Sequence, residues 1–381
     1  MTRTVAKPDV DGLLTDQSVQ ILICCGSGGV GKTTASAALA LRAAEQHGRR
    51  VVVLTIDPAR RLAQSLGLTE LDNIPRAVVG VDPSSGGRLD AMMLDMKRTF
   101  DDVVEAHASP AKAEQILNNR FYQALSTSFS GTQEYMAMEK LGQLHNEART
   151  QGRWDLIVVD TPPSRSALDF LDAPEHLSNL LDGKMLRMLM APARGPFKLM
   201  SVGVNMVMTA MTKILGSGVL KDVQTFVAAF ETLFGGFRQR AEATLRNLSS
   251  PHTRFVVVAT PTRDALREAS FFIDRLREER MPLRGVAINR VHRSELDLSA
   301  ARATAMVEEL EADDPGRYRL ERLALERHAR RMRTVERERD LIEKFKLTNP
   351  EIPMAEVAAQ TQDVNDLESL RRIGAVLAEQ E

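Results

Sequence analysis

The stretch Gly26-Ser27-Gly28-Gly29-Val30-Gly31-Lys32-Thr33-Thr34 decides the fold. It matches the pattern G-x-x-x-x-G-K-[ST], in which backbone N–H groups surround the phosphates of a nucleotide. The apolar residues 21–23 predict a buried strand before it, and the alanine- and leucine-rich run 35–43 predicts a helix after it. Phosphate binding at a helix N-terminus requires this order of strand, glycine-rich turn and helix. The alternative, an accidental glycine-rich turn, does not explain the flanking segments.

Several side chains of this loop have predicted roles. Its glycines let the backbone approach phosphate oxygens, because no Cβ intervenes. Lys32 would reach the β- and γ-phosphates as a point charge, and the Thr33 hydroxyl would join a Mg²⁺ shell. Lys32 is therefore also a candidate catalytic residue. The predicted phosphate-binding residues are Gly26, Ser27, Gly28, Gly29, Val30, Gly31, Lys32, Thr33 and Thr34.

The composition of the 381 residues bounds the functional classes. Fifty Lys and Arg residues balance 51 Asp and Glu residues, which gives no electrostatic argument for nucleic acid as a partner. The two cysteines, Cys24 and Cys25, are neighbours on the first predicted strand, so they predict neither a disulfide framework nor a C-x-x-C metal pair. Residues 1–18 are polar, and no apolar run reaches the length of a membrane span. We expect a soluble cytoplasmic protein, which partners could bring to a membrane surface.

Two further strands are predicted to end in a carboxylate. The β-branched run 51–56 ends at Asp57, at the sheet edge where open α/β sheets bind ligands. Asp57 would orient or deprotonate the attacking water or lie near Mg²⁺, whereas the alternative is a helix cap. The apolar run 156–159 ends at Asp160, as a Walker B strand does, and Asp160 would hold a Mg²⁺-bound water beside Thr33. The stiff segment Asp160, Thr161, Pro162 and Pro163 suits a loop that senses the γ-phosphate.

Helical periodicity interrupts the α/β pattern twice, over 97–150 and 176–248. We assign these segments to one helical subdomain and residues 1–96, 151–175 and 249–381 to the core. The second segment is rich in methionine and apolar on more than one face, which indicates either a self-burying helical subdomain or a groove for a hydrophobic client. The candidate groove residues are Met200, Val204, Met208, Met211, Val223, Val227 and Phe230.

The C-terminal third returns to strands and helices. A strand over 285–290 includes Asn289, whose amide could pair with a purine ring or simply belong to a turn. Residues 316–345 are dense in Arg and Glu, which is typical of a solvated helix face. A last amphipathic helix over 366–379 is expected to pack on the core.

Three of these motifs together resemble the ArsA-type ATPases: Gly-Gly-Val-Gly-Lys-Thr-Thr at 28–34, Asp57-Pro58-Ala59, and Asp160-Thr161-x-Pro. That group includes the arsenite pump ATPase and the ATPase that delivers tail-anchored membrane proteins. The chain looks most similar to the paired actinobacterial ArsA-like proteins. The resemblance implies an α/β fold: a mostly parallel P-loop NTPase sheet of seven or eight strands, with a deviant Walker A loop of the SIMIBI type and an inserted helical subdomain. It also implies a nucleotide-sandwich dimer.

The resemblance also implies residue roles and cofactors. Asp57 matches the switch I aspartate, Asp160 begins switch II, and Asn289 matches an adenine-contacting asparagine. Ala358 and Ala359 fall where a second adenine loop is expected. The implied cofactors are ATP and Mg²⁺, and ATP is preferred over GTP because no [NT]-K-x-D motif is present. No zinc is expected, because the C-x-x-C of the tail-anchored-protein ATPases is absent.

One departure from the family pattern concerns the partner. Relatives usually carry a lysine at the place of Ser27, which reaches the phosphates of the other subunit. A homodimer with Ser27 would lack both of these cations, which favours a heterodimer with a paralogous ArsA-like subunit that supplies the lysine. Turnover by this chain alone is therefore in question.

Three functions fit these expectations. The first is an ATP-driven chaperone or targeting factor for hydrophobic clients, which the methionine-rich helices favour. The second is the energising subunit of an anion or efflux transporter, which would need a membrane channel partner. The third is a regulatory ATPase of the surface-positioning type, which would need a basic amphipathic tail or a DNA-binding patch.

Overall fold

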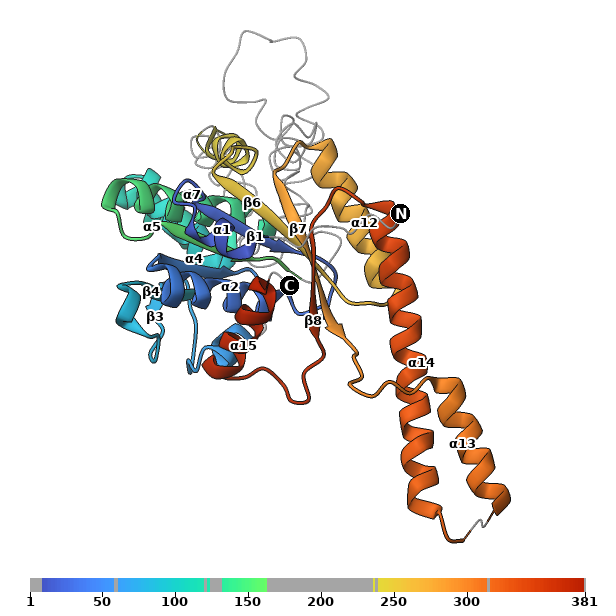
Figure 1. The fold of residues 1–381 in the computed structure, drawn as a ribbon. Coiled ribbons are helices and arrows are strands. Elements are labelled where there is room, and N and C mark those ends of the chain that lie inside the picture. The colour runs from blue at the N-terminus through green and yellow to red at the C-terminus, as the bar shows by residue number, and fades with distance from the viewer. Residues whose placement is uncertain are drawn as a thin grey trace, which may run out of the picture.

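The computed structural model describes residues 9–57, 61–119, 122–123, 132–162, 236, 239–313 and 316–379. Its centre is a single sheet of eight strands: β1 (Ile21–Cys25), β2 (Arg50–Thr55), β3 (Arg76–Ala77), β4 (Arg88–Met93), β5 (Leu156–Asp160), β6 (Thr253–Ala259), β7 (Leu283–Val291) and β8 (Met354–Ala358). The order across the sheet is β3-β4-β2-β5-β1-β6-β7-β8 (Figure 1). Every pair is parallel except β3 with β4 at one edge, which confirms the predicted mostly parallel sheet.

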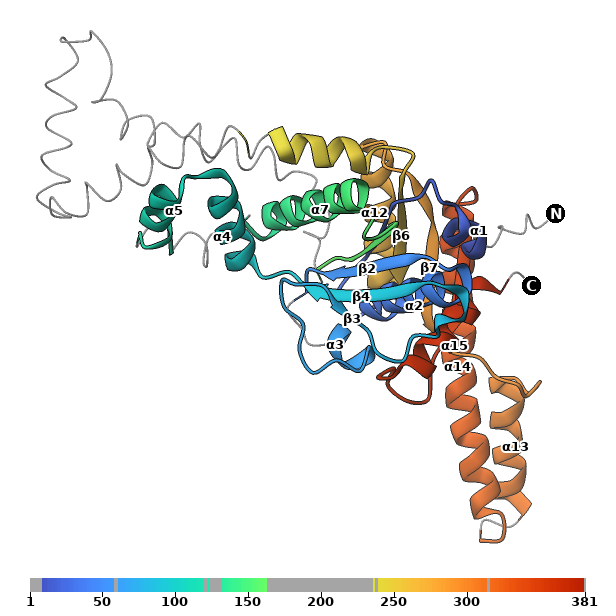
Figure 2. The same cartoon turned by 90° about the vertical axis from the view of Figure 1, so that its left-hand side faces the viewer.

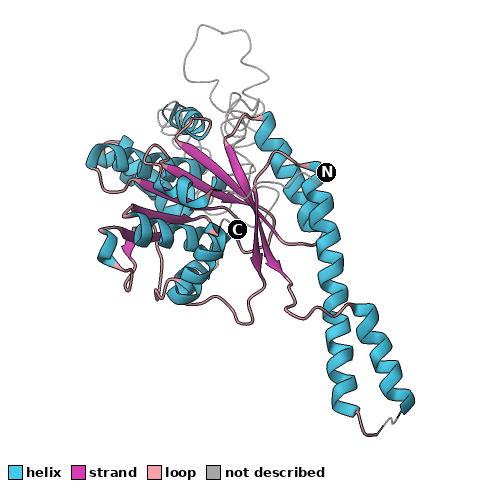
Figure 3. Cartoon of the chain, viewed as in Figure 1, coloured by secondary structure: helices cyan, strands magenta, loops and turns pink. Residues whose placement is uncertain are grey.

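Helices cover both faces of this sheet (Figure 3). One face packs against α1 (Val10–Thr15), α2 (Lys32–His47), α3 (Arg61–Ser65) and α15 (Leu367–Ala378). The other packs against α4 (Met96–His107), α7 (Thr132–Gln151), α12 (Arg263–Glu278) and the helical residues 239–248, and α5 (Pro110–Leu117) packs on α4. A short 3₁₀ turn, η1 (Pro83–Ser85), precedes β4. The result is a three-layer sandwich with the sheet buried in the middle.

Alternation along β1 explains why both layers have an apolar core. Ile21, Ile23 and Cys25 join one cluster of buried residues, whereas Leu22 and Cys24 join the other. This is the two-residue period of a strand, and it confirms that the adjacent cysteines point to opposite faces. Burial raises the pKa of Cys24 to about 12 and raises the pKa of Cys25 further, so both thiols stay protonated at neutral pH.

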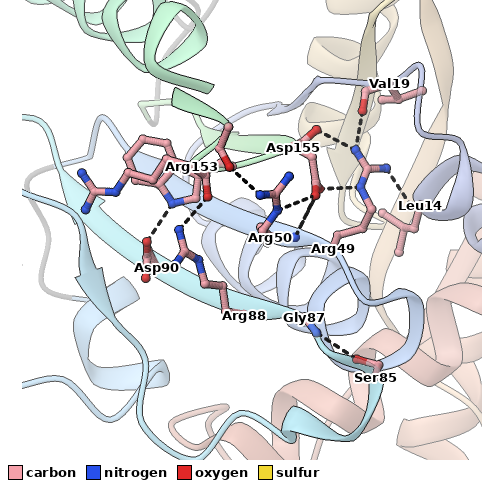
Figure 4. A network of polar contacts seen from close by, with 12 residues as sticks. Leu14, Val19, Arg49, Arg50, Ser85, Gly87, Arg88, Asp90, Arg153 and Asp155 are labelled. Carbon is pink, nitrogen blue, oxygen red and sulfur yellow. Dashed lines mark hydrogen bonds and ion pairs between the residues drawn. The ribbon is translucent and has the colours of Figure 1, made fainter. Parts of the chain in front are cut away.

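A buried arginine fixes one end of the sheet (Figure 4). The guanidinium of Arg49, just before β2, is fully buried. It donates to Asp155 at the start of β5, through Oδ1 and the carbonyl oxygen, both at 2.7 Å. It also donates to the carbonyls of Leu14, Asp16 and Val19 at 3.0, 3.0 and 2.8 Å. One side chain therefore joins the α1–β1 connection to the starts of two central strands.

A helical hairpin interrupts the sheet between β7 and β8. It consists of α13 (Ala300–Asp313) and the first part of α14 (Arg319–Thr348). The buried small side chains of Ala303 and Ala329 lie on the two helices, and the pair projects from the body (Figures 1 and 2). The other end of α14 returns to the core through Ile342 and Phe345. The sequence predicts a charged helix here, and the projecting pair is an additional finding.

The first predicted helical segment, 97–150, contains α4, α5 and α7. Most of the second, including every candidate groove residue from Met200 to Phe230, lies outside the described residues. The groove and the division into core and subdomain therefore stay predictions. None of the helices within the described ranges combines the length and apolar character that a membrane span requires.

Candidate functional site

The glycine-rich loop connects the end of β1 to the start of α2 as predicted. Gly26, Gly29 and Gly31 have φ angles of 150°, 74° and 96°. A Cβ on Gly26 would lie 2.1 Å from the carbonyl oxygen of Val258, and one on Gly31 would lie 2.1 Å from Nδ2 of Asn289. These two positions therefore require glycine for space as well as for backbone conformation.

Lys32, the first residue of α2, is held against its own loop. Only 5 % of the residue is exposed, and its Nζ donates to the carbonyl oxygen of Ser27 at 2.9 Å. Burial lowers the pKa of Lys32, whereas the nearby carboxylate of Asp160 opposes that change. This hydrogen bond spans the loop and keeps the ammonium group at the place where phosphates would lie.

Asp160, the last residue of β5, is the central carboxylate of the site. Its Oδ2 accepts hydrogen bonds from the hydroxyls of Thr33 at 2.8 Å and Thr55 at 2.9 Å. Its Oδ1 is buried and has no hydrogen-bond partner among the described residues. Burial raises the pKa of Asp160 to about 6, although the two hydroxyls and Lys32 act in the opposite direction.

This arrangement fits a magnesium ion. Mg²⁺ is bound in proteins by one or two carboxylates and hydroxyls, together with waters and phosphate oxygens. The unpartnered Oδ1 of Asp160 and the hydroxyl of Thr33 are oxygen ligands of this kind, and they lie together beside the phosphate loop. Thr33 and Asp160 are therefore the residues that would hold the ion, directly or through water.

Thr55 is a site residue that the sequence reasoning does not identify. Besides its bond to Asp160, its Oγ1 accepts a hydrogen bond from the backbone N–H of Asp57 at 3.2 Å. The N–H of Ile56 donates to the carbonyl oxygen of Asp160 at 2.9 Å. The segment before Asp57 is thus attached to the candidate metal ligand through both backbone and side chain.

The start of the segment predicted to be switch II is also attached to the phosphate-loop strand. The hydroxyl of Thr161 donates to the carbonyl oxygen of Cys24 at 3.0 Å. Pro162 follows and is half-buried, whereas Pro163 lies outside the described residues.

A cavity of about 1120 Å³ opens beside the loop. This volume is slightly above the usual range of small-molecule pockets, about 300–1,000 Å³. Eight of the predicted site residues line it: Gly29, Gly31, Lys32, Thr33, Thr34, Asp57, Asn289 and Ala359. The other lining residues come from α3, from the end of β7 and the residue after it, from the segment after β8 and from α15: Arg61, Gln64, Ser65, Arg290, His292, Gln360, Gln362, Asp363, Val364, Asn365 and Ile373. Gly28, Val30 and Ala358 are not among its lining residues but adjoin ones that are. Gly26, Ser27, Asp160, Thr161 and Pro162 do not line it, and Asp160 is fully buried beside the lining residue Thr33.

Asn289 lies in the cavity wall, with its amide turned to the phosphate loop. Its Nδ2 donates to the carbonyl oxygen of Val30 at 2.9 Å, and its Oδ1 accepts from the N–H of Arg290 at 2.9 Å. The side chain therefore supports the loop, and its contact with adenine stays a prediction.

The sequence of the chain is similar to those of several known ATPases. The family model described as anion-transporting ATPase matches residues 19–305. Among curated proteins, ATPase GET3 of Kluyveromyces lactis is 30% identical over 183 residues, covering 46% of this chain and 51% of that protein. ATPase GET3 of Zygosaccharomyces rouxii is 27% identical over 238 residues, covering 58% of this chain and 67% of that protein. ATPase ARSA1 of Chlamydomonas reinhardtii is 26% identical over 315 residues, covering 76% of this chain and 38% of that protein.

The extent of these matches differs between the family and its individual members. The chain spans about half the length of the first of these curated relatives. The family model, in contrast, extends from just before β1 into α13 and includes the phosphate loop, Asp57, Asp160 and Asn289. With the parallel sheet and the cavity at the phosphate loop, this match shows that the chain belongs to the anion-transporting ATPase family, the ArsA-type ATPases.

Proposed function

We propose that the protein binds Mg²⁺-ATP in the cavity at the phosphate loop and hydrolyses its terminal phosphoanhydride bond. The observation that carries this proposal is the carboxylate of Asp160, which accepts from Thr33 of the loop and keeps Oδ1 without a protein partner among the described residues. Lys32 would neutralise charge on the β- and γ-phosphates, and Asp57 would orient the attacking water. Mg²⁺, when bound, supplies additional charge neutralisation on the phosphates.

We further propose that hydrolysis is coupled to the helical insertion. Supporting this, Nε2 of Gln133 near the start of α7 donates to the carbonyl oxygen of Ile56 at 3.1 Å. Ile56 directly precedes Asp57, so a change in the switch I segment would displace the start of a helix of the insertion. A coupled ATPase with a methionine-rich segment, which the sequence predicts to be helical, suits a chaperone or targeting factor for hydrophobic clients. The partner of this protein would be a paralogous subunit that supplies the cation absent at Ser27. The two subunits would act together in the cytoplasm.

The test of catalysis is the ATP turnover of the purified chain, measured alone and with a co-expressed paralogue.

The test of client binding is the affinity for a labelled 20-residue apolar peptide in the presence of ATP or ADP. The double substitution Met208→Glu and Met211→Glu should abolish peptide binding. The same change at two exposed leucines of the hairpin, Leu320→Glu and Leu323→Glu, should not. Equal binding by both double variants would contradict the client role.

A further inference from the structure

Two residues other than glycine have a positive φ among the described residues, Arg280 at 55° and Arg290 at 61°. Side chains other than Gly, Asn and Asp rarely adopt this conformation, so each instance needs a cause. For Arg280 the cause is the end of α12. The N–H of Arg280 donates to the carbonyl of Arg277, and the N–H of Met281 donates to that of Leu276. This is the Schellman pattern, which places a residue in the left-handed region at a helix C-terminus.

No helix ends at Arg290. It lies on β7 where the pairing with β8 shifts register, because Ile288 pairs with Glu356 but Val291 pairs with Ala358. Three steps along β7 therefore correspond to two along β8, which is a β-bulge. Bulges are common beside active sites, where they redirect a side chain. Here the bulge places the exposed side chain of Arg290 in the wall of the cavity.

The strained conformation is held by Asn289. Its Oδ1 accepts the N–H of Arg290, while its Nδ2 donates to Val30 of the phosphate loop. The position of Arg290 is therefore defined relative to the loop. Strain of this kind persists where the surrounding structure enforces it, and it is found most often at functional sites.

The part of the nucleotide that Arg290 would contact follows from the other cavity residues. The phosphate end is defined by Lys32, Thr33 and Asp57. Arg290 and His292 follow Asn289 on β7, and the segment 359–365 after β8 also lines the wall. No Phe, Tyr or Trp is present in the cavity lining contributed by the described residues, although a purine ring binds best between flat groups.

Three planar cationic or aromatic side chains line the cavity, and one of them, Arg61, begins α3 shortly after Asp57 of the phosphate end. The other two, Arg290 and His292, follow Asn289. The imidazole of His292 is fixed to α14, because its Nδ1 lies 2.9 Å from Oε1 of Glu338. The guanidinium of Arg290 pairs with no carboxylate in the described part of the chain. A guanidinium is planar and stacks on aromatic faces, which a lysine ammonium cannot do.

We propose that Arg290 is a base-contacting residue of the nucleotide site, whose guanidinium stacks on the purine ring. This inference rests on the proposed nucleotide binding. It makes the bulge and the left-handed backbone at Arg290 part of the binding site, and it assigns to an arginine the flat surface that an aromatic residue provides in other sites.

The experiment compares Arg290→Gly and Arg290→Lys with the control Arg280→Gly in the full chain. Binding of ATP and of inorganic tripolyphosphate, each with Mg²⁺, is measured by calorimetry, and thermal unfolding is followed in parallel. Removing a stacking side chain should weaken ATP binding about tenfold, with tripolyphosphate binding unchanged. Arg290→Lys should lose as much ATP affinity as Arg290→Gly. Both glycine variants should raise the melting temperature, because each relieves a left-handed residue, but Arg280→Gly should leave both ligands unaffected.

Several results would overturn the inference. ATP affinity that stays unchanged in Arg290→Gly would exclude a contact with the nucleotide. Tripolyphosphate binding that weakens in parallel with ATP binding, with recovery in Arg290→Lys, would identify a phosphate contact and exclude stacking. If the unmodified protein binds neither ATP nor tripolyphosphate, the proposed function itself fails and this inference fails with it.

Discussion

The hydroxyl of Thr55 donates to Oδ2 of Asp160 across two adjacent strands, at 2.9 Å. The two residues are paired in register as the last residues of β2 and β5. Because the strands are parallel, their side chains meet at the same sheet edge. Two residues beyond Thr55 lies Asp57, whose N–H donates to the same hydroxyl. A single threonine therefore connects the candidate metal ligand to the candidate water-orienting residue.

Thr55→Val should lower ATP turnover about tenfold, because a buried carboxylate that loses a donor costs about 1–3 kcal/mol. The variant keeps the size and the β-branched shape of the side chain, so the fold should be retained. Turnover and the Mg²⁺ concentration for half-maximal activity are the measurements, and the latter should rise. Thr55→Ser restores the hydroxyl and should behave like the unmodified protein. Activity of Thr55→Val within twofold of normal would show that the hydroxyl is dispensable.

Gly31→Ala should abolish nucleotide binding, whereas Gly29→Ala should only weaken it. Both glycines have positive φ, but a Cβ at Gly31 would lie 2.1 Å from Nδ2 of Asn289, and one at Gly29 has no atom within 4 Å. The Gly31 variant must displace Asn289 and with it the bond to Val30, whereas the Gly29 variant bears only the backbone strain of about 1–2 kcal/mol. Calorimetric titration with ATP distinguishes the two. Equal losses would mean that backbone conformation alone matters.

Lys32→Ala should eliminate ATP turnover, because this ammonium is the cation that the loop holds at the phosphate position. The measurement is phosphate release by the purified protein, alone and with the proposed paralogous subunit. Lys97→Ala is the control, since Lys97 is a half-exposed lysine on α4 that pairs with Asp101 at 2.6 Å, and it should leave turnover unchanged. Normal turnover of Lys32→Ala would refute the site.

Ser27→Lys should raise the turnover of the chain in the absence of a partner. In the proposed dimer, a lysine at this position would supply a cation to the other subunit, and cations supplied in trans accelerate phosphoryl transfer by about 10³–10⁵. A gain of at least about tenfold that depends on protein concentration is expected. Ser27→Gln adds length without charge and should give no gain. If the lysine variant also shows none, the absent cation does not explain a preference for a paralogous partner.

The parts of the site that can be predicted from sequence are those with a local signature. The phosphate loop, Asp57 and Asp160 each follow an apolar strand, and parallel strands bring such ends together. The contribution of Thr55 has no local signature, because a threonine among valines is also an ordinary strand residue. Only the order β2-β5-β1, which places residue 55 beside residue 160, reveals it.

Two other features depend on pairing between distant segments. The bulge at Arg290 exists only relative to β8, more than sixty residues later. The hairpin of α13 and α14 buries alanine and valine at its seam, including Ala303, Val307 and Ala329. Such small side chains give a weak hydrophobic period among many charges, so the sequence indicates a solvated helix. In both cases the decisive interaction is non-local.

Arg49→Ala should lower the free energy of unfolding by about 3–5 kcal/mol, because it leaves Asp155 without its buried partner and removes the donors of three carbonyl groups. Arg50→Ala is the matched control. Arg50 contacts the same carboxylate at 3.2 Å, but its side chain is 46% exposed, so the loss should stay below about 1 kcal/mol. Urea unfolding of both variants gives the two values. If they proved equal, the five hydrogen bonds of the buried Arg49 side chain would contribute no more to stability than an ion pair at the surface.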